Sequence, residues 1–306
     1  MTASIPTFPT LEVALNETAY SALFLDAFGV FWAGNAQGVF PGSQRTMEQL
    51  FSSGKKIGII SNSTQPSQSE IKKYASQGIL QGRHFHFLIT SGDLAKELFS
   101  SDRLPFPTPN KKYILFCPHC PPYAPPSSLF EESPFRETDD LLEADFIYIN
   151  VPHICGVNQE ERNAFHSMVK SFLPSNKPMV CANPDHYAHE GSPPRPVVRQ
   201  GSIASLYEEM GGHVFYIGKP FSQIYSLALD RLNRLSPTPK EKILMVGDTP
   251  ETDIRGARSF GIHSALITHT GIMAEKIAHQ GPASIQSLPT SDIPNFFIER
   301  FASHVF

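Results

Sequence analysis

Residues that could transfer a phosphoryl group lie in short segments spread over this chain of 306 residues. Asp26 and Ser61 each follow an apolar run, Lys219 precedes a proline, and Asp248 and Asp253 form an acidic pair. A carboxylate can attack phosphorus and form an aspartyl phosphate, which divides a very slow hydrolysis into two easier steps. We therefore interpret Asp26 as a nucleophile.

A bound cation would offset the repulsion between this nucleophile and an anionic substrate. Mg²⁺ prefers oxygen ligands and usually keeps several waters, so a few carboxylates suffice to hold it. The segment Gly247–Asp253 provides two of them on a turn that enters a helix. Asp26, Asp248 and Asp253 are the side chains that we expect at a Mg²⁺ site.

Three further residues could bind the phosphoryl group itself. Ser61 and the main-chain amide of Asn62 can donate hydrogen bonds to phosphoryl oxygens, and Lys219 can neutralise charge on the nucleophile and on the transferring group. Taken alone, Ser61 could be an ordinary helix cap and Lys219 a solvated loop lysine. Their order along the chain, together with the acidic residues, favours the functional interpretation.

The elements that must position these residues alternate between strands and helices, which favours a parallel sheet covered by helices. We expect strands at 22–25, 56–60, 85–89, 214–217, 242–246 and 264–267. We expect helices at 45–51, 68–77, 92–99, 222–232 and 252–259. The candidate site residues then follow the carboxyl ends of strands, the edge where open α/β sheets bind ligands.

The middle of the chain has a different pattern, beginning with a proline-rich stretch. Strands are expected at 146–151 and 179–182, around a helix at 160–172. A region of about 85 residues between two halves of a sheet is more easily an inserted domain than a loop. We place this insertion at 103–187.

Composition limits the partners and the location. With 41% hydrophobic and 18% charged residues the chain can bury a large core, and a net charge of −4 offers no basic surface for nucleic acid or an anionic membrane. This charge favours a small ligand over a polyanion. A cytoplasmic location is expected, because no apolar run is long enough to cross a membrane. Four cysteines form no disulfide framework. Cys117 and Cys120 have redox-pair spacing, but the prolines that follow favour a loop.

These segments together resemble the four motifs of the haloacid dehalogenase superfamily. The motifs are Asp26-x-Phe28-Gly29-Val30, Ser61-Asn62, Gly218-Lys219-Pro220 and Gly247-Asp248-x-x-x-x-Asp253. Further landmarks resemble the class IIA subgroup, which carries a large inserted cap. They are Gly34, Pro41-Gly42, Thr90-Ser91, Asn183-Pro184-Asp185 and Thr270-Gly271.

The resemblance implies a fold and a class of substrate. The subgroup includes phosphatases of p-nitrophenyl phosphate, pyridoxal phosphate, phosphoglycolate and nucleotides. Residues 1–102 and 188–306 would form a Rossmann-like core, and the smaller α/β cap would close over the site and select the substrate. Asn183 and Asp185 would lie on a cap loop near the site. Dimers formed through the cap are common in the subgroup, so the resemblance leaves a homodimer as one alternative for this chain.

One position departs from the resemblance. Family phosphatases have an aspartate two residues after the nucleophile, which protonates the leaving group and then activates water, whereas this chain has Phe28. A positioned acid/base contributes about 10²- to 10⁴-fold in rate. The main-chain carbonyl of residue 28, which binds the metal in the family, is retained.

Three interpretations follow from this departure. The chain could be a weakened or specialised Mg²⁺-dependent phosphatase of a small phosphorylated metabolite, with His186 or Asp185 as another acid. It could instead bind phosphoryl groups without useful turnover, or cleave phosphonates or halides. The third is disfavoured because the metal-binding carboxylates are present and no Schiff-base lysine is evident near the cap. The retained nucleophile and metal ligands favour the phosphatase.

Overall fold

The computed structural model describes residues 5–117, 126–153, 159–190 and 195–303. The chain divides into two compact units. The first consists of Met1–Ser61, Ser67–Ile89 and Lys219–Phe306, and the second of Asn62–Pro66 and Thr90–Gly218.

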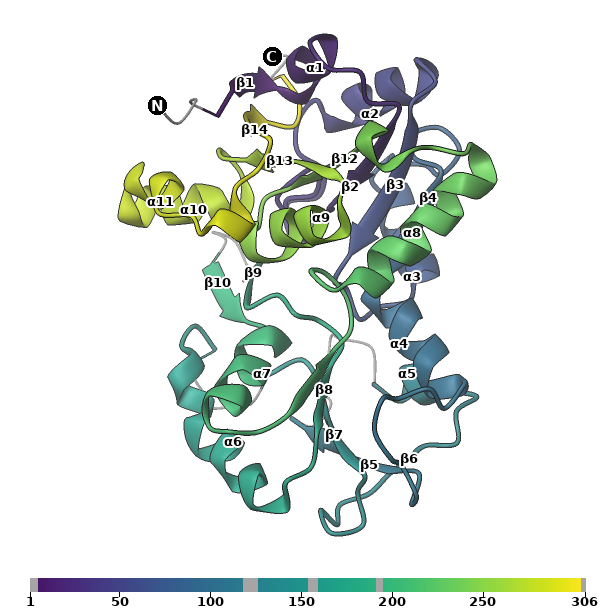
Figure 1. The fold of residues 1–306 in the computed structure, drawn as a ribbon, viewed down its shortest axis with the longest axis vertical. Coiled ribbons are helices and arrows are strands. Elements are labelled where there is room, and N and C mark those ends of the chain that lie inside the picture. Colours follow the sequence, from purple (N-terminus) through teal and green to yellow (C-terminus); the bar gives the residue numbers. More distant parts are fainter. Residues whose placement is uncertain (1–4, 118–125, 154–158, 191–194, 304–306) are drawn as a thin grey trace. The chain divides into compact units, whose positions relative to one another are not determined.

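The first unit is built on a seven-stranded sheet with helices (Figure 1). Its strand order is β1 (Thr7–Thr10), β14 (Phe296–Arg300), β13 (His263–Ile267), β12 (Ile243–Gly247), β2 (Ala22–Leu25), β3 (Lys56–Ser61) and β4 (Phe87–Thr90). The pairs from β1 to β3 are parallel. Its helices are α1 (Leu11–Asn16), α2 (Ser43–Ser52), α3 (Ser67–Ala75), α8 (Ser222–Leu235), α9 (Arg255–Phe260), α10 (Gly271–Gln280) and α11 (Ala283–Gln286).

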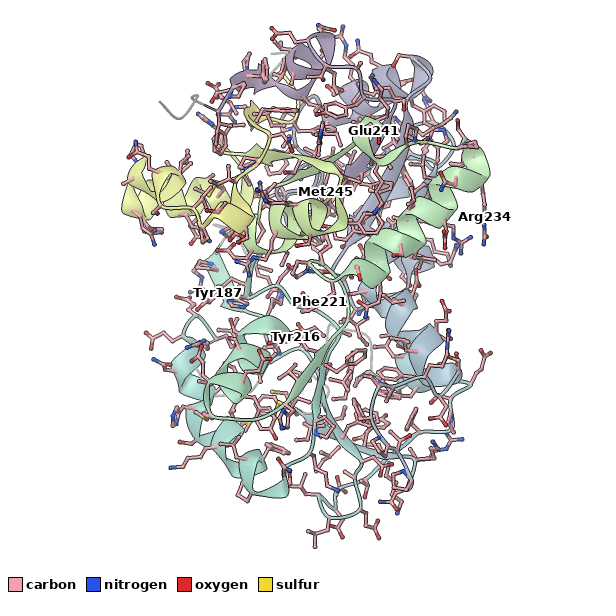
Figure 2. All side chains as sticks on the ribbon, viewed as in Figure 1. Tyr187, Tyr216, Phe221, Arg234, Glu241 and Met245 are labelled. Carbon is pink, nitrogen blue, oxygen red and sulfur yellow. The ribbon has the colours of Figure 1, made fainter. Side chains whose placement is uncertain are left out.

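The central strands of this sheet are apolar throughout, because both of their faces are covered. All four residues of β2 and all five of β12 are buried, as expected for strands inside a parallel α/β sheet. Figure 2 shows Met245 of β12 within this unit and Phe221 directly before α8. The predicted fold class, an α/β fold with a Rossmann-like parallel sheet, is confirmed.

The second unit has its own α/β architecture. Its five-stranded sheet has the order β11 (Val214–Tyr216), β8 (Met179–Cys181), β7 (Phe146–Ile149), β5 (Lys112–Phe116) and β6 (Arg136–Glu137). In a separate two-stranded sheet, β9 (Tyr187–Glu190) pairs in antiparallel orientation with β10 (Arg195–Val198). The helices are α4 (Ser91–Ser100), α5 (Ser127–Phe130), α6 (His166–Phe172) and α7 (Gln200–Glu209). A cluster of stacked aromatic rings, including Phe99 on Phe130 and Phe130 on Tyr113, fixes α4 and α5 to the sheet.

The structure divides the chain at other positions than 103–187. Strand 214–217 was expected in the sheet of the core, but β11 pairs in parallel with β8 of the second unit. α4 and α7 also belong to that unit. A short apolar segment predicts a strand and carries no information about which sheet it joins. The helix expected at 252–259 begins as a π-helical turn at Pro250–Ile254 and continues as α9.

Two features concern membrane-spanning helices and redox chemistry. No helix within the described ranges combines the length and the apolar character that a membrane crossing requires. Cys117 is a free, buried thiol, and burial raises its pKa to about 12. Little of it is therefore in the reactive thiolate form at neutral pH. Cys120, the other member of the pair, lies outside the described residues.

Two histidines next to β3 and β4 should make the stability of the first unit depend on pH. Nδ1 of His84 accepts a hydrogen bond from the Leu80 amide at 2.8 Å, and Nδ1 of His86 accepts one from the Ile57 amide at 3.1 Å. Desolvation by burial lowers the pKa of both side chains below the ordinary value of 6.5. The folded protein therefore binds these protons only at a lower pH than the unfolded chain does.

We expect the contribution of the two neutral histidines to the free energy of unfolding to be fully present above about pH 7. It should fall as the pH drops through 6.5, by at most about 1.4 kcal/mol per pH unit for each histidine. Urea denaturation at a series of pH values measures this slope. His84→Asn keeps an acceptor for the amide and should reduce the slope, whereas the exposed His279→Asn should leave it unchanged. An equal slope in the parent and in His84→Asn would contradict the assignment.

Candidate active site

The ends of neighbouring parallel strands bring the predicted motif residues of the first unit to one edge of the sheet. β2 lies between β12 and β3, and the amide of Asp26 donates a hydrogen bond to the carbonyl of Val246 at 2.9 Å. Asp26 and Asp248 directly follow β2 and β12, and Ser61 is the last residue of β3. All three side chains are buried.

Lys219 links two of the carboxylates. Its ammonium nitrogen lies 2.8 Å from Oδ1 of Asp26 and 2.7 Å from Oδ1 of Asp253. Lys219 is 1% exposed and Asp253 is fully buried, so water screens these pairs little. An ammonium group between two carboxylates neutralises part of their charge and fixes the orientation of Asp26.

Asp253 also shapes the turn that carries the other acid. Its Oδ2 accepts hydrogen bonds from the amides of Asp248 and Thr249, each at 3.1 Å. A Cβ at Gly247 would lie 2.2 Å from the Asp253 carboxyl group, so only glycine allows the strand to approach this closely. Asp253 thus anchors both Lys219 and the turn after β12.

The side chain of Asp248, which follows β12, lies against the N-terminus of α10. Its Oδ2 accepts a hydrogen bond from the Ile272 amide at 2.7 Å, and its Oδ1 accepts one from the Thr249 hydroxyl at 3.1 Å. Burial, and after it the charges of Asp26 and Asp253, raises the pKa of Asp248 well above its usual range. The ionised form therefore needs additional positive charge, to which the helix N-terminus contributes.

Two glycines enclose the Asp248 carboxylate. Gly29 and Gly271 have φ angles of +74° and +69°, which disfavour any residue with a side chain. A Cβ would lie 2.2 Å from Oδ2 of Asp248 at Gly29 and 1.9 Å at Gly271. Both positions therefore require glycine.

The three carboxylates suit a divalent cation. One oxygen from each of Asp26, Asp248 and Asp253 lies within 4.8 Å of the others. These three buried carboxylates outnumber the Lys219 ammonium group that pairs with two of them, and their oxygens match the ligands that Mg²⁺ prefers. Both oxygens of Asp253 already accept hydrogen bonds, so a direct bond from Asp253 to a metal would compete with Lys219 or with the turn amides.

Phe28 lies in the loop after β2. Its half-buried ring packs against the hydrophobic core of the first unit. Its main chain bridges to Trp32, and the amide of Gly29 donates to the Trp32 carbonyl at 3.0 Å. The loop is therefore closed on itself next to the nucleophile.

The remaining predicted residues belong to the second unit. The side-chain amide of Asn62 donates to Oδ1 of Asp185 at 2.9 Å, and Oδ1 of Asn183 accepts from the Asp185 amide at 3.1 Å. The side chain of His186 is exposed. Asn62 and Asp185 thus meet, although they are 123 positions apart in the sequence.

Two contributions were not predicted from the sequence: the Thr249 hydroxyl and the Ile272 amide that hold Asp248. The Ile272 amide had an available signal, since Thr270-Gly271 follows an apolar strand and opens a helix. The hydroxyl had none, because a threonine in a turn is common.

Comparison with known proteins places the motifs in a family. A family model described as haloacid dehalogenase-like hydrolase matches residues 23–118, and one described as HAD-hydrolase-like matches residues 216–290. Together they span more than half of the chain. They include Asp26, Ser61, Lys219, Asp248 and Asp253.

Solved structures share the fold. A haloacid dehalogenase-like hydrolase from Brucella suis 1330 is 22% identical, with a TM-score of 0.75 over 96% of this chain and 99% of that one. A 4-nitrophenylphosphatase from Thermotoga maritima is 22% identical, with a TM-score of 0.62 over 92% and 95% of the two chains. NagD from E. coli K-12 is 17% identical, with a TM-score of 0.60 over 94% and 98%.

A curated relative matches over a shorter stretch. The cardiolipin synthase (CMP-forming) / mitochondrial hydrolase fusion protein of Schizosaccharomyces pombe is 37% identical over 91 residues. This match covers 26% of the present chain and 15% of the fusion protein. The chain therefore corresponds to a small part of that protein's length.

Proposed function

Because the chain belongs to the haloacid dehalogenase superfamily of hydrolases, we propose that it is a Mg²⁺-dependent phosphatase of a small phosphorylated metabolite. The observation that carries this proposal is the arrangement of Asp26, Lys219 and Asp253, in which a buried ammonium group holds a carboxylate at the end of β2. The structural similarity to a 4-nitrophenylphosphatase and to NagD supports it.

Asp26 is the proposed nucleophile. Its carboxylate oxygen attacks phosphorus, the bond to the leaving oxygen breaks, and an aspartyl phosphate forms. Lys219 orients Asp26 and neutralises part of the charge on the transferring group, and Asp253 fixes Lys219. Ser61 and Asn62 are the proposed donors to the phosphoryl oxygens.

Asp26, Asp248 and the main-chain carbonyl of Phe28 are the groups proposed to hold Mg²⁺, with Asp253 as a further predicted ligand. When bound, the ion would supply positive charge that offsets repulsion between the carboxylates and the anionic substrate. The raised pKa of Asp248, which burial and the charges of Asp26 and Asp253 cause, supports this role.

The second unit is proposed to be the cap that selects the substrate, with Asn183, Asp185 and His186 as candidate contacts. Asp185 or His186 could also provide an acid that Phe28 cannot. A small metabolite is the proposed partner, not nucleic acid or a membrane. A cytoplasmic location is proposed from the few cysteines, and a homodimer remains a prediction.

Phe28 supports a second candidate, a protein that binds phosphoryl groups without useful turnover. The two candidates differ in one measurement, phosphate release from p-nitrophenyl phosphate with and without Mg²⁺. Release that depends on Mg²⁺ supports the phosphatase. A folded protein that releases no phosphate, but that inorganic phosphate stabilises in the presence of Mg²⁺, supports the binding protein.

Metal binding can be tested without activity. We expect millimolar Mg²⁺ to raise the melting temperature of the parent, because an ion that binds only the folded state stabilises it by mass action. Asp248→Asn should lose most of this shift. Asp230→Asn, the same change on the exposed face of α8, should retain it. Equal shifts in all three proteins would contradict a metal site at Asp248.

A further inference from the structure

A charged and aromatic cluster on α3 lies against the loop that follows the nucleophile. We define the α3 cluster as Glu70, Lys73 and Tyr74. Lys73 and Tyr74 lie three and four positions after Glu70, so both are neighbours of Glu70 on the helix surface. The side chains of Glu70 and Lys73 are 5% and 26% exposed and form an ion pair, and Tyr74 is fully buried.

The ammonium group of Lys73 lies among three aromatic rings. Its nitrogen is 5.2 Å from the ring centroid of Phe28, 5.4 Å from that of Trp32 and 5.0 Å from that of Tyr74. Trp32 and Tyr74 also pack on each other, with centroids 5.1 Å apart. Cation–π attraction and the ion pair with Glu70 together fix the position of this charge.

The α3 cluster is electrostatically connected to the nucleophile. Burial, and then the charges of Glu70 and Asp26, raises the pKa of Tyr74 well above its usual range. The negative charge of Asp26 therefore reaches Tyr74, whose ring lies beside the Lys73 ammonium group. Trp32 is 2% exposed and Tyr74 is buried, so Lys73 and the half-buried ring of Phe28 are the parts of this group that reach solvent.

We propose that Lys73, as a fixed positive charge beside Phe28, stabilises the leaving group in place of the acid that residue 28 lacks. This inference rests on the proposed phosphatase function. As Asp26 attacks phosphorus, the electron pair of the breaking bond goes to the leaving oxygen, and its negative charge develops near the ammonium group. Water supplies the proton that this oxygen finally takes. A second water then hydrolyses the aspartyl phosphate.

The dependence on the leaving group distinguishes this role from a structural one. For Lys73→Gln we expect kcat/KM to fall about 10²-fold with alkyl phosphates, whose leaving oxygens are strongly basic. It should change little with p-nitrophenyl phosphate, whose leaving group is already stable as an anion. The plot of log kcat/KM against leaving-group pKa should therefore become steeper.

Two variants control for folding and for charge. Lys73→Arg keeps the charge and the cation–π contacts, and should restore most of the activity with alkyl phosphates. Lys72→Gln removes the same charge from an exposed neighbour on α3, and should behave like the parent. Circular dichroism and thermal unfolding establish that each variant is folded.

The outcomes separate this inference from the proposed function. A steeper plot for Lys73→Gln alone supports the role of Lys73. An active parent with an unchanged slope, or with an equal loss for every leaving group, overturns that role and leaves the phosphatase in place. A folded parent that hydrolyses none of the esters overturns both.

Discussion

Replacing Asp26 by asparagine is expected to reduce phosphate release from p-nitrophenyl phosphate by at least about 10³-fold, because the amide cannot serve as the nucleophile. The substitution keeps the shape of the side chain next to Lys219. It also removes one of the charges that raise the pKa of Asp248. Because the side chain keeps its shape and loses a repulsive charge, the protein should stay folded, and the loss should appear in kcat.

The matched control for this prediction is Asp230→Asn, which makes the same chemical change at an exposed position of α8. It should have the kcat of the parent. Steady-state assays in excess Mg²⁺, together with thermal unfolding of each protein, give the comparison. If Asp26→Asn retains more than a tenth of the parent kcat, Asp26 is not the nucleophile.

Replacing Phe28 by aspartate is expected to raise kcat with alkyl phosphates by about 10²-fold, because a positioned acid/base contributes about 10²- to 10⁴-fold. The gain should be smaller with p-nitrophenyl phosphate, since nitrophenol leaves readily without a proton. Residue 28 follows the nucleophile by two positions, and its ring is half-buried. An aspartate there can reach solvent and exchange protons.

Phe28→Asn is the control for size and polarity, because asparagine resembles aspartate but cannot transfer a proton. It should show no gain. A gain of equal size in both variants would mean that removing the ring opens the site, and no gain in either would place the acid elsewhere. Circular dichroism must show that both variants retain the packing of the loop.

The sequence predicted the architecture of the first unit well, because its signals are local. Apolar runs such as β2 and β12 are long enough to identify buried strands, and motif residues follow them directly. The prediction was weakest where the partner of a strand matters. β11 has only three residues, and nothing in them indicates that it pairs with β8 or lies against α7.

For the candidate site, the sequence indicated candidate residues, but it did not predict what each side chain contacts. It predicted Asp253 as a metal ligand, and the structure adds that Oδ1 of Asp253 accepts from Lys219 and Oδ2 accepts from the amides of the turn after β12. The α3 cluster could not be predicted. Its proposed role depends on a helix face that meets Phe28 and Trp32, and in the sequence Glu70 and Lys73 resemble any solvent-exposed i,i+3 pair.

Detection of the covalent intermediate tests the central claim most directly. The parent protein, mixed with p-nitrophenyl phosphate and Mg²⁺ and quenched in acid, is digested and analysed by mass spectrometry. We expect a phosphoryl group on the peptide that contains Asp26. It should accumulate, because no carboxylate at residue 28 activates the water that would remove it. Phosphate release with no phosphoryl group on that peptide would contradict the mechanism.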